Sequence, residues 1–126
     1  MQIRLISRLQ KGPLICAEGY LFELERPGYL QAGTFAPEVS LTHPEALRQV
    51  HRDFCLCGSE VVVAFTYNGH RQKMREVGKE ALLEPLNRQA LRLARETAGE
   101  FPDLDLLVAG NISNTNIFDQ DDPASK

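Results

Sequence analysis

The chain has 126 residues, of which 43% are hydrophobic and 25% charged, a composition typical of one globular domain rather than of a disordered or fibrous chain. Its 14 basic and 17 acidic residues are interspersed and give a formal net charge of -3, so no basic stripe indicates nucleic-acid binding. No apolar run reaches the roughly 20 residues of a membrane span and no signal peptide is evident, so we expect a cytoplasmic protein with free thiols.

The N-terminal quarter of the chain alternates between helical and extended patterns. Apolar residues at helical spacing predict a helix over residues 3–9, which Gly12-Pro13 ends. The apolar run at 14–17 predicts a short buried strand. Residues 20–25 are then expected to form a short helix.

A stronger helix and strand pattern follows. Segment 42–45 has the form of a capping box, in which the Thr42 hydroxyl and the Glu45 carboxylate would each accept a hydrogen bond from a free backbone N–H. Apolar residues then recur on one helical face until Gly58. The β-branched run at 61–67 shows no polar alternation, which predicts a strand buried on both faces, as in parallel sheets.

The last third repeats the same alternation. Asn68-Gly69 is expected to begin a loop that runs through three basic residues, Arg71, Lys73 and Arg75. An amphipathic helix is predicted from residue 82 to Gly99, and a third strand over 105–110. The polar residues from 111 onward read as a loop.

The element order indicates an α/β fold with parallel strands. Strands that alternate with helices imply right-handed βαβ crossovers. No G-x-G-x-x-G motif or P-loop follows any of the predicted strands, which argues against the nucleotide-binding versions of this fold. Three parallel strands leave two open edges, so we expect either a partner that completes the sheet or a chain that is a piece of something larger.

Three polar clusters follow the three predicted strands, at 18–20, 66–68 and 111–115. Ligands of parallel α/β proteins bind at the carboxyl ends of strands, so these clusters could share one site, although loops are polar in any case. Glu18 could bind a substrate ammonium or act as a base, or it could favour the start of the following helix through the macrodipole.

Histidine and cysteine spacing does not indicate a metal site. His51 has no partner at a recognised zinc spacing and is expected on the surface or in a groove, while His70 is interpreted as a loop residue rather than a ligand contact. Cys16 is expected in the core. Cys55 and Cys57 point about 200° apart on a helix, so one should be in the core and the other partly exposed.

An ordered series of motifs covers nearly the whole chain. The motifs are Glu18-Gly19-Tyr20 through Arg26, Gly28-Tyr29, Gln31-Ala32-Gly33, Pro37-Glu38, His43-Pro44-Glu45, His51-Arg52-Asp53-Phe54, Phe65-Thr66-Tyr67 and Ala109-Gly110-Asn111-Ile112-Ser113. Together they resemble the start of the homocysteine S-methyltransferase and betaine–homocysteine S-methyltransferase family.

The resemblance implies a zinc-dependent (β/α)8 TIM barrel. Residues 1–118 would be the N-terminal part of its homocysteine-binding barrel, about the first three βα units with parallel strands, and 119–126 a polar tail at the truncation point. In such enzymes zinc holds the homocysteine sulfur as a thiolate, which attacks a methyl group on a betaine-like or sulfonium donor and gives methionine.

The resemblance also implies substrate contacts, without identifying a catalytic residue. The acid of the family's first strand falls on Ala17, and we expect the neighbouring Glu18 to take its role. Phe35, Tyr67 and Asn68 fall where betaine-using members carry aromatic residues that contact the donor. Because Asn68 is not aromatic, the aromatic cage for a quaternary ammonium would have fewer rings here. The expected substrate-binding residues are Glu18, Gly19, Tyr20, Phe35, Phe65, Thr66, Tyr67, Asn68 and Asn111.

The family's zinc cysteines would lie beyond residue 126, and Cys16, Cys55 and Cys57 do not match them. We therefore expect this chain alone to bind no zinc, to lack activity, and to self-associate or pair with the missing half of the barrel. The alternative is a non-catalytic binding or assembly module derived from the same family. The ordered motifs argue against an unrelated α/β enzyme.

Overall fold

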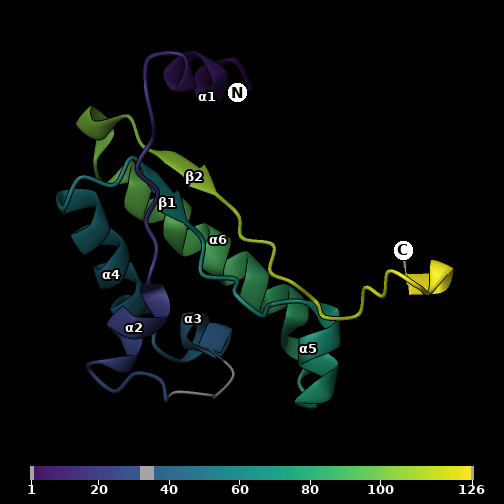
Figure 1. The fold of residues 1–126 in the computed structure, drawn as a ribbon. Coiled ribbons are helices and arrows are strands. Elements are labelled where there is room, and N and C mark those ends of the chain that lie inside the picture. The colour runs from purple at the N-terminus through teal and green to yellow at the C-terminus, as the bar shows by residue number, and fades with distance from the viewer. Residues whose placement is uncertain (1, 32–35, 126) are drawn as a thin grey trace.

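The computed structural model describes residues 2–31 and 36–125 (Figure 1). Its helices are α1 (Gln2–Leu9), α2 (Tyr20–Glu25), α3 (Val39–Thr42), α4 (Pro44–Leu56), α5 (Arg71–Glu76) and α6 (Leu83–Gly99). Its strands are β1 (Val61–Val63) and β2 (Leu107–Ala109). Short 3-10 turns are η1 (Ala36–Glu38), η2 (Glu80–Leu82), η3 (Pro102–Leu104) and η4 (Pro123–Ser125).

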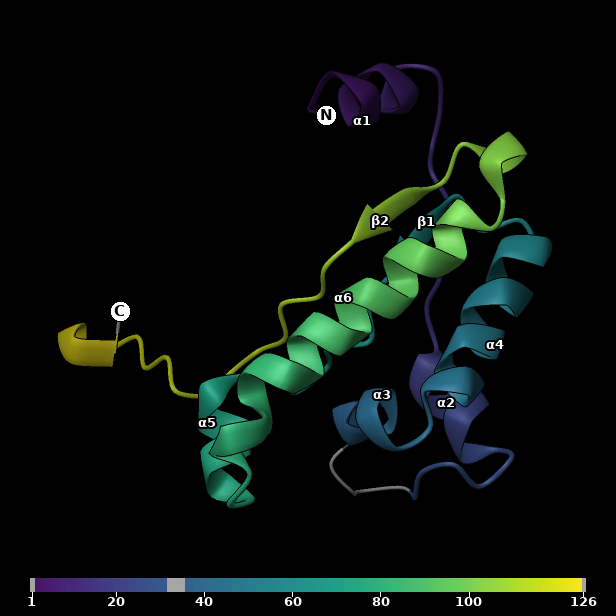
Figure 2. The ribbon, with the colours of Figure 1, turned by 180° about the vertical axis from the view of Figure 1, so that it is seen from behind.

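The extended segments are parallel, as predicted. In the register of β1 and β2, Val61 lies opposite Leu107 and Val63 opposite Ala109. Cys16 forms a parallel bridge to Val61, and the backbone N–H of Ala17 donates to the Val61 carbonyl at 3.0 Å. Helix α6 packs against both strands: it lies behind them in Figure 1 and in front of them in Figure 2.

The strands are shorter than predicted. The segment at 14–17 is not a strand and pairs only through the bridge at Cys16. Residues 61–66 are all buried, but β1 ends at Val63, because the chain turns where the N–H of Thr66 donates to the Ala64 carbonyl at 2.9 Å. β2 begins only after Asp105, whose φ of 50° is not extended backbone.

Helices α1, α2, α4 and α6 confirm the periodicity of the sequence, but the predicted capping box is wrong. Thr42 ends α3, and its hydroxyl donates to the Glu38 carbonyl at 3.2 Å. His43 is the N-cap residue of α4, with Pro44 in the first turn and no side-chain cap hydrogen bond. Among the described helices, none combines the length and apolar character that a membrane crossing requires.

The basic segment predicted as a loop contains helix α5. His70 precedes it with extended backbone, and its Nδ1 accepts a hydrogen bond from the backbone N–H of Lys73 at 3.3 Å. That bond satisfies one of the free donors at the helix start. Histidine is not among the preferred N-cap residues, which is why the sequence pattern did not indicate this helix.

Successive side chains of β1 and of the residues that follow it belong to two different clusters of the core. Val62 and Ala64 pack with Cys55 of α4 and Ala94 of α6. The other side of the segment belongs to a larger cluster with Ala17, Tyr20, Leu24, Leu30, Val39, Leu47, Val61, Val63, Phe65 and Leu93. This alternation is the period-two pattern of a strand covered on both sides.

Two residues depart from their predicted burial. Cys16 is exposed rather than in the core, because it lines an open apolar hollow beside Val61 and Leu107. His51 is fully buried rather than on the surface, because it lies on the inner face of α4 with Leu47 and Cys55. The prediction for Cys55 and Cys57 is confirmed, since the first is buried and the second exposed.

Helix α1 stands apart from the other helices, beyond the amino end of the strands (Figure 1). Polar contacts attach it there. Arg8 forms an ion pair with Glu60 at 2.8 Å and donates to the Asp105 carbonyl at 2.7 Å, and Arg4 pairs with the Asp105 carboxylate. Its apolar Leu5 and Leu9 line the same open hollow as Cys16.

Candidate functional site

A cavity of about 320 Å³ lies where the parallel segments end. Its lining residues come from the start of α2, from the end of β1 and from the loop after β2; they are Glu18, Gly19, Tyr20, Leu21, Phe22, Val63, Ala64, Phe65, Tyr67 and Asn111. Parallel strands bring their carboxyl ends to one edge, so three loops that are distant in the sequence meet here.

Most of the residues predicted to bind substrate lie at this cavity. Glu18, Gly19, Tyr20, Phe65, Tyr67 and Asn111 line it. Thr66 and Asn68 are not in the lining, and Phe35 lies outside the described residues. The structure therefore brings together the three polar clusters that the sequence predicted to converge.

Glu18 supplies the carboxylate of the cavity. The preceding residue, Ala17, is buried in the core and hydrogen-bonded to Val61, so Glu18 is the first residue to leave the bridged segment. Side chains of an extended chain alternate in direction, which turns Glu18 away from the core that holds Ala17. Gly19 follows with φ 85°, a conformation that glycine adopts without strain.

Aromatic rings form much of the cavity wall. Tyr20 is buried and its ring stacks on Phe65 with centroids 5.9 Å apart. Phe22 and Tyr67 are exposed at the cavity. Rings beside a single carboxylate suit a small molecule that has an apolar body and a positive charge.

Thr66 and Asn68 connect the two loops instead of lining the cavity. The Thr66 hydroxyl donates to the Asn111 carbonyl at 2.7 Å. The backbone N–H of Asn68 donates to the Ser113 hydroxyl at 3.1 Å. These two bonds hold the loop after β2 against the loop after β1, and so fix the position of Asn111 in the cavity.

Sequence reasoning missed His51 behind this cavity. Its Nδ1 lies 3.0 Å from the Tyr20 hydroxyl oxygen, and it is fully buried. Burial, with a smaller effect of the Arg48 charge, lowers the pKa of His51 to about 4. Its placement at helical spacing between Leu47 and Cys55 was the signal that could have indicated a buried position.

The described residues do not fit a zinc site. Within residues 2–31 and 36–125, no three histidine, cysteine or acidic side chains are grouped so that they could hold a metal ion. Cys16 and Cys57 are exposed and Cys55 is buried, and burial raises the pKa of the Cys55 thiol, which favours its protonated form. Zinc normally takes at least three protein ligands.

Two other hollows have different characters. A groove of about 470 Å³ between α2 and α4 is lined in large part by polar side chains that bond to near neighbours in the sequence, such as Arg26 to Glu23 at 3.2 Å and Gln49 to Asp53 at 2.8 Å. An apolar hollow of about 500 Å³ lies between α1 and the strands. Neither combines an aromatic wall with the carboxyl ends of the strands.

Comparison with known proteins gives consistent relatives. The family described as homocysteine S-methyltransferase matches residues 14–125. An S-methylmethionine–homocysteine S-methyltransferase of Pongo abelii is 38% identical over 115 residues, which cover 90% of this chain and 30% of that protein. Betaine–homocysteine S-methyltransferase 1 of Danio rerio is 39% identical over 113 residues, covering 87% of this chain and 28% of that protein.

A solved structure supports the fold. The metallated form of the homocysteine methyltransferase MmuM from Escherichia coli superimposes with a TM-score of 0.72 at 24% identity, over 87% of this chain and 41% of that chain. This chain spans about 30% of the length of the two curated relatives from Pongo abelii and Danio rerio.

Proposed function

Since this chain belongs to the homocysteine S-methyltransferase family, we propose that its protein transfers a methyl group from a betaine-like or sulfonium donor to the sulfur of homocysteine, giving methionine. The observation that carries the proposal is the cavity at the carboxyl ends of the parallel segments, where Glu18 lies among aromatic side chains. The comparisons do not favour the alternative of a non-catalytic module.

The reaction defines what the cavity has to do. The homocysteine sulfur forms a new bond to the methyl carbon while the bond from that carbon to the donor's nitrogen or sulfur breaks. The bonding electron pair stays with the donor, which leaves as an amine or a thioether, and the thiol proton is lost. Because both reactants carry a cationic group, the site needs negative charge and polarisable surfaces.

Glu18 and the rings are suited to hold the substrates. We assign to Glu18 the binding of the homocysteine ammonium group, through charge-assisted hydrogen bonds. Tyr67 and Phe22 offer exposed ring surface to the donor's cationic group.

Zinc enters the proposal only through the family. A metal ion would stabilise the thiolate of homocysteine, which is mostly protonated at neutral pH. Within residues 2–31 and 36–125 no three suitable side chains are grouped to hold it, so a zinc ion in this protein would need ligands from outside these ranges.

Methionine production tests the proposed function. The protein, as its gene encodes it, is incubated with homocysteine and with either betaine or S-methylmethionine, and methionine is measured by mass spectrometry. We expect methionine with at least one donor. The absence of methionine with both donors, from folded protein supplied with zinc, would contradict the proposal.

The role of Glu18 is tested with Glu18→Gln. The loss of a charged partner should raise KM for homocysteine by roughly tenfold or more, with a smaller change in kcat. Glu25→Gln is the matched control, because Glu25 lies on α2 but does not line the cavity. An unchanged KM in Glu18→Gln would exclude the assignment of Glu18 and leave the reaction itself in place.

A further inference from the structure

Tyr20 is the most constrained side chain at the cavity. It lines the cavity although only 4% of its surface is exposed. Its ring makes edge contacts with His51 and Phe54, with centroids 5.0 Å and 4.9 Å away, and it stacks on Phe65. Aromatic pairs at these separations fix ring orientation as well as burying area.

The Tyr20 hydroxyl is held from two directions. The backbone N–H of Val63 donates to its oxygen at 3.4 Å, and the Nδ1 of His51 lies 3.0 Å from the same oxygen. Burial raises the pKa of Tyr20, and nearby negative charge at Glu18 contributes a smaller effect in the same direction. The hydroxyl therefore keeps its proton and can donate it in a hydrogen bond.

Counting donors and acceptors decides the direction of the bond between Tyr20 and His51. If Tyr20 donates to Nδ1, the proton of neutral His51 is on Nε2, and that N–H is one buried donor without a partner among the described residues. If His51 donates instead, both the phenolic proton and the Nε2 lone pair are left without a partner. The first arrangement leaves fewer polar groups unsatisfied.

His51 is placed to act on the cavity only through Tyr20. It is fully buried and is not in the cavity lining. Its low pKa keeps the ring neutral near pH 7, so Nδ1 stays available as an acceptor. On α4 it is fixed between Leu47 and Cys55, which are also buried.

We propose that His51 is a positioning residue of this cavity: by accepting the hydrogen bond from Tyr20 it fixes the Tyr20 ring as the wall against which homocysteine packs beside Glu18. The inference deepens the proposed function and rests on it for the identity of the substrate. A wall held in one rotamer before binding reduces the side-chain ordering that binding would otherwise require.

Steady-state kinetics test the positioning role with four variants. Tyr20→Phe removes the hydroxyl, His51→Leu removes the acceptor, and the double variant removes both. His51→Asn keeps a polar group near the position of Nδ1. Each of the first two should raise KM for homocysteine by about 3- to 10-fold, as for loss of one hydrogen bond, and the double variant should be no worse than either. His51→Asn should recover part of the loss.

A purely structural role predicts a different pattern. Cys55→Ala, at a buried position one turn further along α4, is the matched control, which should lower the melting temperature without changing KM. If His51→Leu behaves like Cys55→Ala, or if Tyr20→Phe has the wild-type KM for homocysteine, the positioning role is overturned while the methyl-transfer function stands.

A second measurement does not depend on activity. The flip rate of the Tyr20 ring is followed by NMR in the full protein with labelled tyrosine, and Tyr20→Phe identifies the Tyr20 signal among those of the other tyrosines. We expect slower flipping in the wild type than in His51→Leu. Equal rates overturn the positioning role. Should the wild type make no methionine, the proposed function fails and the flip rates still decide whether His51 holds the ring.

Discussion

Neutral His51 makes the stability of the fold depend on pH. Burial lowers the pKa of His51 from 6.5 to about 4, so on acidification the unfolded chain takes up a proton at this residue before the folded chain does. The stability it contributes is complete above about pH 6.5 and is lost as the pH falls to about 4. At 1.36 kcal/mol per pKa unit, the loss approaches about 3 kcal/mol.

Urea unfolding at several pH values measures this dependence. The wild-type free energy of unfolding should fall between pH 6.5 and pH 4. His51→Leu, which cannot be protonated, should show a smaller decline over the same interval, although it is less stable at pH 7. Parallel pH profiles for the two proteins would show that His51 is not the residue responsible.

Gly69 marks a position where a side chain does not fit. A Cβ atom there would lie 2.9 Å from the Thr66 carbonyl oxygen and 3.2 Å from Oδ1 of Asn87. The residue is also fixed by two hydrogen bonds: its N–H donates to the Thr66 carbonyl, and its carbonyl accepts from Asn87. The backbone oxygen cannot retreat without disturbing the turn that leads into the cavity loop.

Gly69→Ala should therefore destabilise the chain by about 1–3 kcal/mol in urea unfolding, the range for overpacking a tight site. Gly99→Ala provides the control, because no atom lies within 4 Å of its Cβ position and it ends helix α6. That substitution should be neutral or stabilising by up to about 1 kcal/mol. Equal effects of the two substitutions would contradict the steric argument.

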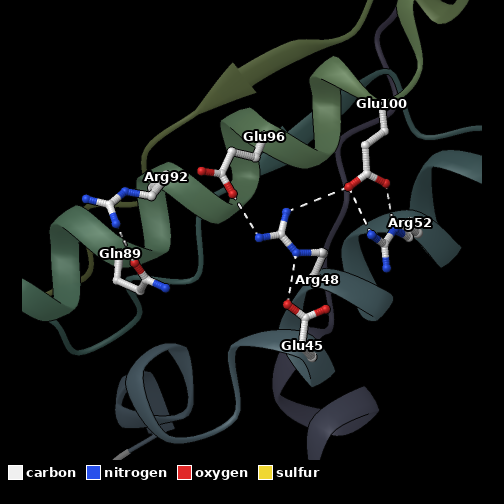
Figure 3. Close-up of polar contacts among 7 residues, drawn as sticks. All are labelled: Glu45, Arg48, Arg52, Gln89, Arg92, Glu96 and Glu100. Atoms are coloured by element: carbon white, nitrogen blue, oxygen red, sulfur yellow. Dashed lines mark hydrogen bonds and ion pairs between the residues drawn. The ribbon is translucent and has the colours of Figure 1, made fainter.

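At the scale of elements, α4 and α6 are joined by a network of charged side chains (Figure 3). Arg48 bonds to Glu96 at 2.8 Å and to Glu45 at 3.4 Å, and Arg52 holds Glu100 through two bonds of 2.6 and 3.0 Å. The bond to Glu96 is the main cause that raises the pKa of Arg48. The two-pronged contact of Arg52 likewise lowers the pKa of Glu100.

Arg48→Ala should destabilise the chain by about 1 kcal/mol, because Arg48 connects three carboxylates and its side chain is only 17% exposed. Arg92→Ala is the matched control on α6, since Arg92 contacts only Gln89, at 3.4 Å, among the residues of Figure 3. It should change stability by under about 0.5 kcal/mol. Thermal melts at low and high salt check both, and the Arg48 effect should shrink with salt.

The type of an element was predictable from the sequence wherever its hydrophobic periodicity extended over enough residues. Helices α4 and α6 and the parallel direction of the strands follow from apolar periodicity and from the alternation of elements. Helix α5 was not predictable in this way, because its start depends on a histidine side chain acting as the cap. The number of strand residues in the segment at 14–17 was also not predictable, because pairing depends on the neighbouring strands and not on these four residues alone.

The candidate site was predictable in part. The cluster of Glu18, Tyr67 and Asn111 followed from the rule that parallel strands end at one edge. Distinguishing Thr66 and Asn68 from the lining residues required coordinates, because adjacent residues of a loop can face the cavity or bond across it. Contact between His51 and Tyr20 is a tertiary pairing that no local pattern encodes.

At the scale of the whole molecule, apolar surface remains open between α1 and the strands. The hollow there is lined by side chains from α1, from 14–16 and from both strands: Leu5, Leu9, Leu14, Cys16, Val61, Leu107, Val108 and Ala109. Leu5, Leu9 and Val108 are 44%, 52% and 41% exposed. Contiguous apolar surface of this kind promotes association in water.

We therefore predict that the isolated 126-residue chain self-associates with increasing concentration. Sedimentation velocity over a range of concentrations should show the mean mass rising, and Val108→Lys should suppress the rise by placing a charge in the hollow. Leu56→Lys is the control, because Leu56 is 71% exposed but lies on α4, away from the hollow. A monomer at all concentrations, or equal effects of the two substitutions, would contradict the prediction.

Metal binding also depends on the whole molecule, because the fold must bring several ligand side chains within reach of one ion. Within the described ranges no group of three or more suitable side chains forms, and the buried Cys55 thiol has a raised pKa that disfavours the thiolate. The untagged 126-residue chain should therefore keep less than stoichiometric zinc after dialysis, and a chelator should leave its circular dichroism unchanged. One equivalent of zinc that survives dialysis, and that is lost when Cys16, Cys55 and Cys57 are all replaced by serine, would contradict this prediction.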